Sequence, residues 1–192
     1  DGEQRSAFSA SGPAQLAQPV QASLDMPTPV IQEIDRSPRM LKRFLREVAA
    51  AGLSPGPGST QPVVEADLAT LPETAQRYLR FMEVLGRPRT WSLRARWTGG
   101  FRMRPDRPFV PCEVWQYDES AEIARIFHMR VRLGGLLPVV VRDTYVRGCG
   151  RMLGRAFDAF TIVDESSYKL DAGELVTYLN DGILLAPSML LG

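Results

Sequence analysis

Residues 139–155 read Val-Val-Val-Arg-Asp-Thr-Tyr-Val-Arg-Gly-Cys-Gly-Arg-Met-Leu-Gly-Arg, and this stretch decides the fold. A run of β-branched residues opens it, and an Arg147-Gly148 pair follows where a tight turn belongs. We therefore predict a β-hairpin with one strand over residues 139–146 and a return strand from Cys149.

The segments before this hairpin also have the pattern of strands. In residues 91–103 the odd positions are mostly large and apolar and the even positions are mostly Arg, which is the alternation of a sheet with one apolar face. Gly99-Gly100 interrupts this strand as a bulge or bend. Further strands are predicted over residues 109–117 and 123–133, and Gly134-Gly135 turns the chain into the hairpin. Because no crossover helix separates these strands, the sheet is expected to be antiparallel.

Three helical segments accompany the predicted sheet. A basic amphipathic helix is expected over residues 38–51 and a second helix over residues 72–85. A third begins at Asp171, where Glu174 follows at the spacing of a capping box, and ends at Gly182. The predicted fold class is therefore α+β, a curved, half-barrel-like antiparallel sheet with packing helices.

Composition divides the chain into two parts. Residues 1–62 contain a Ser-, Ala-, Gln- and Pro-rich stretch that is typical of a disordered tail, then the basic helix, and then a Pro/Gly linker. Residues 63–192 carry the α+β domain. The apolar segment over residues 183–191 ends the chain without a polar terminus. We therefore expect the domain to continue past residue 192 and hydrophobic surface to be exposed near the sheet and this end.

Charge and hydropathy exclude some classes of protein. The net charge of +1 gives no reason to expect a nucleic-acid partner. No apolar run approaches the roughly 18 residues of a membrane-spanning helix, and the first ten residues lack the core of a signal peptide. The expected location is cytoplasmic or membrane-associated. The helix over residues 38–51 could lie on an anionic membrane or dock on its own domain.

The cysteines and the single histidine do not predict a metal site. Cys112, Cys149 and His128 are too few for a closed zinc site, which needs four ligands, so no metal or cofactor is expected. Two free thiols are expected, because a disulfide would require their strands to be neighbours. His128 alternates with Arg130 and Arg132 and is predicted to be a surface residue.

Four motifs carry a resemblance to a known family. They are EADLATLPETAQRYL over residues 65–79, GRPR over 86–89, RDTYVRGCGRMLGR over 142–155 and LDAGELVTYL over 170–179. In this order, over about residues 63–192, they resemble an uncharacterised bacterial family of unknown function. The resemblance implies the fold and further strands beyond this point, and it implies no agreed activity. The order of helix, strands and helix is also similar in topology to the half-barrel carriers that ferry lipoproteins.

Two groups of side chains are candidates for function. An aromatic row could be core or could line a groove for a hydrophobic ligand on the curved sheet, and it comprises Trp91, Trp97, Phe101 and Trp115. This gives the first hypothesis, a non-enzymatic domain that binds a hydrophobic or lipid-like molecule. The Arg residues at 94, 96, 102, 104, 130 and 132 are predicted to be a solvated outer face or, alternatively, a site for an anionic ligand.

The alternative hypotheses use the charged residues of the last two motifs. A hydrolase or transferase would use the carboxylate of Asp143 or Glu174 beside Arg142 or Arg151. The competing interpretation is structural, with Glu174 in a helix cap and Asp143 in an ion pair. A third hypothesis is a protein-interaction domain that uses a sheet edge or the basic helix. The sequence does not indicate an oligomeric state.

Overall fold

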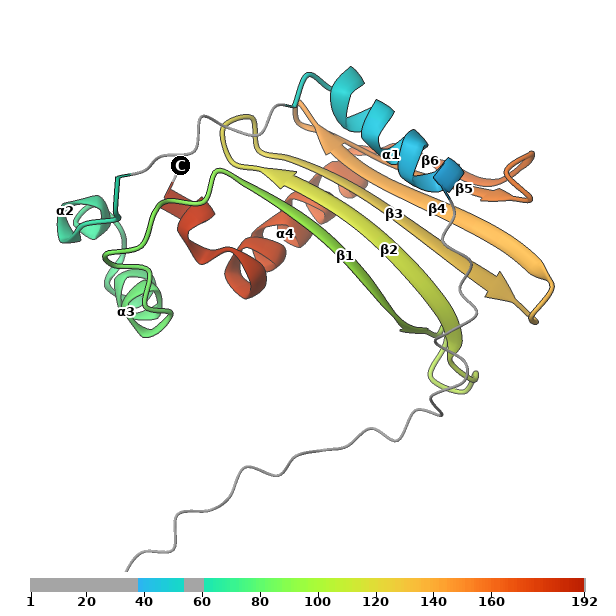
Figure 1. Ribbon diagram of the computed structural model, residues 1–192, viewed down its shortest axis with the longest axis horizontal. Helices are drawn as coiled ribbons and strands as arrows, with labels where there is room; N and C mark the ends of the chain where they lie inside the picture. The colour runs from blue at the N-terminus through green and yellow to red at the C-terminus, as the bar shows by residue number, and fades with distance from the viewer. Residues whose placement is uncertain (1–37, 54–60, 192) are drawn as a thin grey trace, which may run out of the picture.

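The computed structural model describes residues 38–53 and 61–191, and its centre is an open, curved, six-stranded antiparallel sheet (Figure 1). The strands lie in the sheet in chain order, so each pairs only with its neighbours in the sequence. This meander confirms the predicted α+β class and the antiparallel sheet. The strands are β1 (Ser92–Phe101), β2 (Val110–Glu119), β3 (Ala124–Leu133), β4 (Leu137–Val146), β5 (Cys149–Ala156) and β6 (Phe160–Glu165).

The predicted hairpin is present between β4 and β5. Arg147 and Gly148 have φ angles of 53° and 80°, the left-handed values that a two-residue hairpin turn of this type needs. Val146 pairs with Cys149 directly after the turn. Strand β6 was not predicted. Its turn is formed by Phe157 and Asp158, also at positive φ, so no glycine marks it in the sequence.

The described residues also form five helical elements. Helix α1 matches the predicted basic helix, and α3 is shorter than predicted because its last turn gives way to a left-handed residue, Glu83. Figure 1 shows α1 and α4 on opposite faces of the sheet, with α2 and α3 together at one end. The elements are α1 (Pro38–Ala50), α2 (Glu65–Leu68), α3 (Glu73–Phe81), α4 (Tyr168–Leu185) and the 3-10 helix η2 (Pro187–Leu191).

The predicted limits of α4 are wrong at both ends. Its N-cap is Ser167, whose side chain accepts a hydrogen bond from the amide of Leu170. Asp171 instead accepts a hydrogen bond from the amide of Gly150, and Glu174 is buried against the sheet, so the two do not form a capping box. The helix also continues past Gly182, where a side chain would come within 2.8 Å of Leu190. That glycine provides space between α4 and η2.

The two faces of the sheet have different cores. Face A is defined by the side chains of Trp115, Tyr117 and Ile126, which α1 covers with Phe44 and neighbouring apolar residues. Face B is defined by the alternate side chains of the same strands, including those that contact α4. The tail predicted for residues 1–30, and residues 54–60 of the linker predicted for residues 53–62, lie outside the described residues.

Face A corrects two predictions about polar residues. His128 has no exposed surface and lies under α1, so the prediction that it is a surface residue is wrong. The Arg residues of this face are not all solvated. Arg94, Arg96 and Arg132 are exposed and Arg130 is half-buried, and Arg96 and Arg130 both bind the fully buried carboxylate of Glu113, at 2.6 and 3.0 Å. Buried acidic partners therefore explain part of the arginine pattern.

Candidate functional site

Face B is divided into an apolar half and a polar half. The pairing of the strands places eleven apolar side chains together at one end of the face, and most of them form one core cluster that contains no residue of a described helix. These residues are called the apolar half. They are Trp97, Phe101, Val110, Cys112, Val114, Met129, Val131, Leu133, Leu137, Val139 and Val141.

The polar half of face B begins with the next side chain along each strand that points to the same face. Val114 of β2 is followed on face B by Gln116 and Asp118, and Val141 of β4 is followed by Asp143. Arg125 of β3 lies opposite Asp118. Helix α4 covers this half of the face.

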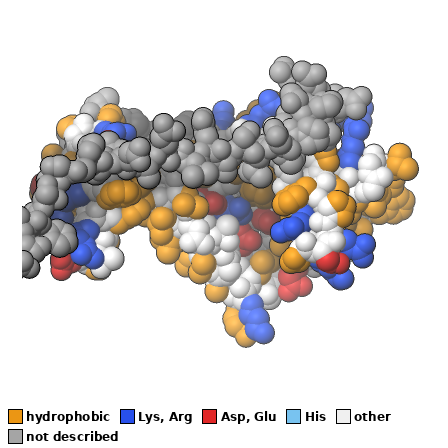
Figure 2. Space-filling model, turned by 90° about the horizontal axis from the view of Figure 1, so that it is seen from below, with side chains coloured by type: hydrophobic (Ala, Val, Ile, Leu, Met, Phe, Trp, Pro, Cys, Tyr) orange, Lys and Arg blue, Asp and Glu red, His pale blue; other side chains and the backbone are white. Residues whose placement is uncertain are grey.

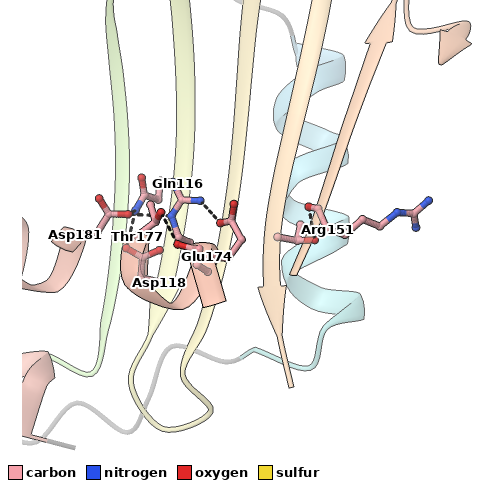
Figure 3. A network of polar contacts seen from close by, with 9 residues as sticks. Gln116, Asp118, Arg151, Glu174, Thr177 and Asp181 are labelled. Atoms are coloured by element: carbon pink, nitrogen blue, oxygen red, sulfur yellow. Dashed lines mark hydrogen bonds and ion pairs between the residues drawn. The ribbon is translucent and has the colours of Figure 1, made fainter. Parts of the chain in front are cut away.

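Arg125 is the centre of a buried network under α4 (Figure 3). Its guanidinium donates to Glu174 at 3.0 Å and to Asp181 at 2.9 Å, both on the helix. Gln116 donates to Asp118 and to Asp181, each at 2.7 Å. The network therefore joins two strands to two residues of α4 that lie two helical turns apart.

The carboxylates of this network outnumber its cations. Burial raises the pKa of Asp118 to about 7, although the hydrogen bond from Gln116 acts in the opposite direction. Burial and the charge of Glu174 raise the pKa of Asp143 to about 6. Burial also raises the pKa of Glu174 despite its ion pair with Arg125. One oxygen each of Asp118 and Asp143 is buried without a hydrogen-bond partner, which is the environment of a carboxyl group that retains its proton.

Glycine allows α4 to approach the sheet closely. A side chain at Gly150 of β5 would lie 2.9 Å from the carbonyl oxygen of Leu170 in the first turn of α4. The amide of Gly150 donates to Asp171 at 2.6 Å, which fixes this end of the helix. The glycine in the third motif of the sequence is therefore required for the docking of α4.

A groove of about 410 Å³ lies beside the polar half. It lies between α4, η2 and the turn from β2 to β3. Tyr178 lines this groove. Burial, and to a smaller extent the charges of Asp118 and Glu119, raise the pKa of Tyr178 to about 12. Further apolar side chains are exposed along α4, among them Leu184. Figure 2 shows groups of hydrophobic side chains at the surface, interrupted by acidic and basic ones.

The structure separates the four predicted aromatic ligand-binding residues. Trp97 and Phe101 belong to the apolar half. Trp115 points to face A, where it packs in the core under α1. Trp91 precedes β1 and lies with the side chain of Arg89 over its ring. The four therefore do not line one groove, and two of them remain as candidates.

The predicted carboxylates do come together, with a different arginine. Asp143 lies close enough to Glu174 and Arg125 for each to influence its pKa. Arg142 instead contacts Glu47 of α1 on face A. Arg151 pairs with Asp164, and Figure 3 shows it pointing away from the network.

The sequence did not indicate the other members of the network. They are Gln116, Asp118, Arg125 and Asp181. The only available signal was Arg125, the one charged residue on the otherwise apolar face of β3.

The two cysteines differ in exposure and in their place in the sheet. Cys112 is buried on β2, Cys149 is exposed at the start of β5, and both are free. Among the described residues, no three His, Cys, Asp or Glu side chains come together so as to hold a metal ion. None of the helices in the described ranges is long and apolar enough to cross a membrane.

Comparison with known proteins gives one match. The model of a family of unknown function (DUF6544) matches residues 61–192, which includes every strand and α2 to α4. Helix α1 precedes the matched residues. No curated protein and no solved structure matches the chain.

Proposed function

The chain belongs to this family of unknown function, and we propose that its domain binds a hydrophobic or lipid-like ligand on the apolar half of face B. The observation that carries the proposal is an apolar sheet surface whose core cluster includes no residue of a described helix. A sheet face normally packs against another element, because exposed apolar surface is unfavourable. Cys112, Val114, Val131 and Val139 at the centre of this surface are buried, whereas Trp97 at its edge is exposed, so a bound apolar molecule would extend the packing from that edge.

The size of this surface supports a ligand rather than a chance patch. Three rows of side chains across four strands cover roughly 14 by 14 Å, from a spacing of about 6.8 Å between alternate residues and about 4.8 Å between strands. Trp97 at its edge is 37% exposed, so a bound molecule could reach it. The boundary with Gln116 and Asp143 places polar groups at one end. An amphipathic molecule, such as a fatty acid or a lipid, would match this arrangement.

Tryptophan fluorescence tests the proposal on the full chain. After organic extraction, the protein is titrated with a dibrominated fatty acid, which quenches only nearby tryptophans. We expect saturable quenching that is largely lost in Trp97→Phe and retained in Trp115→Phe, because Trp115 lies on face A. Quenching that is unaffected by Trp97→Phe, or a protein that binds neither the probe nor any extracted lipid, would contradict the proposal.

A second pair of variants tests the surface itself. Val139→Thr with Val141→Thr adds two hydroxyl groups to the apolar half with almost no change in shape. Since an unpaired buried hydroxyl costs about 1–3 kcal/mol, we expect affinity to fall tenfold or more. Val140→Thr is the matched control, because it lies on the same strand and faces the other way. Equal affinities of the two variants would place the ligand elsewhere.

One observation favours a second candidate function, a hydrolase or transferase. The pKa of Asp143 at about 6 lies near the pH at which a carboxyl group can act as an acid or a base. Against this, Arg125 and Glu174 are buried, so a substrate could reach them only if α4 moved. An activity panel comparing wild type with Glu174→Gln tests it. Activity that this folded variant lacks would favour the enzyme, and no activity in either protein would dismiss it.

A further inference from the structure

Helix α1 presents two different faces. Its inward face buries Met40, Phe44 and Val48 against the sheet. Its only acidic residue, Glu47, also points inward, where it contacts His128 at 2.6 Å and Arg142 at 3.6 Å. The outward face therefore contains no carboxylate.

The outward face is basic and partly apolar. Arg39, Lys42 and Arg46 are exposed along it. Between them Leu41 and Leu45 are 38% and 39% exposed, although neither contributes to the core under α1. A helix surface of this composition, with basic residues around apolar ones, is typical of helices that lie at a membrane interface.

The basic residues do not serve the helix itself. Positive side chains in the first turns oppose the helix dipole, and the first turn of α1 has no acidic residue to offset them. The exposed side chains of Arg94 and Arg132 extend the basic surface onto the same face of the sheet. Since the whole chain has a net charge of only +1, this concentration is local.

We propose that the outward face of α1 docks on an anionic phospholipid bilayer, with α1 still packed on the sheet. The basic side chains bind the negatively charged headgroups, and Leu41 and Leu45 enter the interface between them. Charge complementarity and these two leucines favour a bilayer over a nucleic acid, which offers no apolar phase. The proposal is independent of the ligand on face B, because the two surfaces lie on opposite sides of the sheet (Figure 1).

Vesicle flotation tests this docking with the full chain. We expect binding to phosphatidylcholine vesicles that contain 30% phosphatidylserine, little binding to phosphatidylcholine alone, and release as salt increases. Each basic residue near an anionic surface strengthens binding roughly fivefold. The triple variant Arg39→Gln, Lys42→Gln and Arg46→Gln should therefore bind on the order of 100-fold more weakly.

A charge-matched control separates the local surface from net charge. The triple variant Arg77→Gln, Arg104→Gln and Arg107→Gln removes three exposed charges outside α1. We expect it to retain at least a third of wild-type binding. Leu41→Gln with Leu45→Gln should weaken vesicle binding severalfold without changing its dependence on salt. Circular dichroism confirms that each variant is folded.

Three results with vesicles would overturn the proposal. They are no preference for anionic vesicles, equal loss in the two triple variants, or full binding in the leucine variant. Binding to duplex DNA that matches vesicle binding and ignores the leucine variant would also overturn it. Loss of fatty-acid quenching alone would contradict only the proposed ligand on face B.

Discussion

Helices α1 and α4 cover opposite faces of one sheet, and they are attached by opposite kinds of contact. Helix α1 buries an apolar stripe that includes Phe44, and a single inward carboxylate, Glu47, adds its contacts to His128 and Arg142. Helix α4 places Glu174 and Asp181 against Arg125 in a network with more carboxylates than cations. The first interface is an apolar core with ion pairs at its margin, among them Arg43 with Asp158, and the second is a buried electrostatic contact.

The two interfaces should respond to pH in opposite directions. Burial would raise the pKa of Glu47, but its contacts with His128 and Arg142 outweigh burial and lower it. A group whose pKa is lowered in the fold stabilises the folded state at pH values above its ordinary pKa. This stabilisation is lost as the pH falls. Burial raises the pKa values of Asp118, Asp143 and Glu174 under α4, so their contribution to stability is largest at low pH and is lost as pH rises. Acidification should therefore loosen α1 and tighten α4.

Among the variants that test this comparison, removing Arg125 should lower the unfolding free energy most. Arg125→Met leaves the buried Glu174 and the partly buried Asp181 without a cation, and breaking a buried ion pair typically costs about 3–5 kcal/mol of unfolding free energy. The loss should be larger at pH 8 than at pH 5, because the carboxylates can take up protons at the lower pH. Urea denaturation at the two pH values measures it. A loss below about 1 kcal/mol would show that the network contributes little.

Removing Phe44 should give the second-largest loss of unfolding free energy, and this loss should not depend on pH. Phe44 is fully buried under α1, and Phe44→Ala leaves a cavity that typically costs about 3 kcal/mol or more. The same denaturation experiment at pH 5 and pH 8 should give equal losses. Leu45→Ala, on the outward face of the same helix, is the control and should cost much less. A strong dependence on pH would mean that Phe44 is coupled to the His128–Glu47 pair against which it packs.

Asp118→Asn should remove part of the pH dependence of stability. The pKa of Asp118 is about 7 in the fold and 3.8 in the reference state, so the native protein binds the extra proton between these values. Its stability should therefore fall as pH rises from about 4 to 7, by an amount on the order of 2 kcal/mol. The amide variant should flatten this slope. A wild type that becomes steadily more stable over that range would contradict the predicted protonation.

Removing Arg151 should have the smallest effect. Arg151 and Asp164 are both about half exposed, and a pair of this kind usually contributes about 0–1 kcal/mol. Arg151→Gln should therefore change the unfolding free energy by less than about 0.5 kcal/mol, with no dependence on pH between 5 and 8. A loss approaching that of Arg125→Met would mean that the arginine of the third motif does belong to the network.

The fold was largely predictable because its strands carry local signals. Alternation identified β1 and β3, and paired turn residues at 134–135 and 147–148 fixed the hairpins. Strand β6 was missed because its turn uses Phe157 and Asp158, which give no glycine signal. The start of α4 was misplaced because Asp171 and Glu174 have the spacing of a cap, although both bind partners on distant strands.

The candidate site was less predictable for a physical reason. Whether a charged side chain is solvated or buried depends on which helix covers its strand, and sequence periodicity does not contain that information. His128 and Arg125 illustrate this, since α1 covers the first and α4 the second. For the same reason Trp115 and Trp97, close in the sheet, were assigned to one aromatic row although they face opposite sides.

The chain-order meander has a consequence for synthesis on the ribosome. Each strand can pair as soon as the next has emerged, yet the two carboxylates that bind Arg125 are made 49 and 56 residues after it. At about 5–20 residues per second the nascent sheet therefore keeps this guanidinium without its partners for several seconds. We expect stalled nascent chains that end before α4 to contain paired strands with an unprotected face B. Translation of α4 would then supply the two carboxylates that bind this guanidinium.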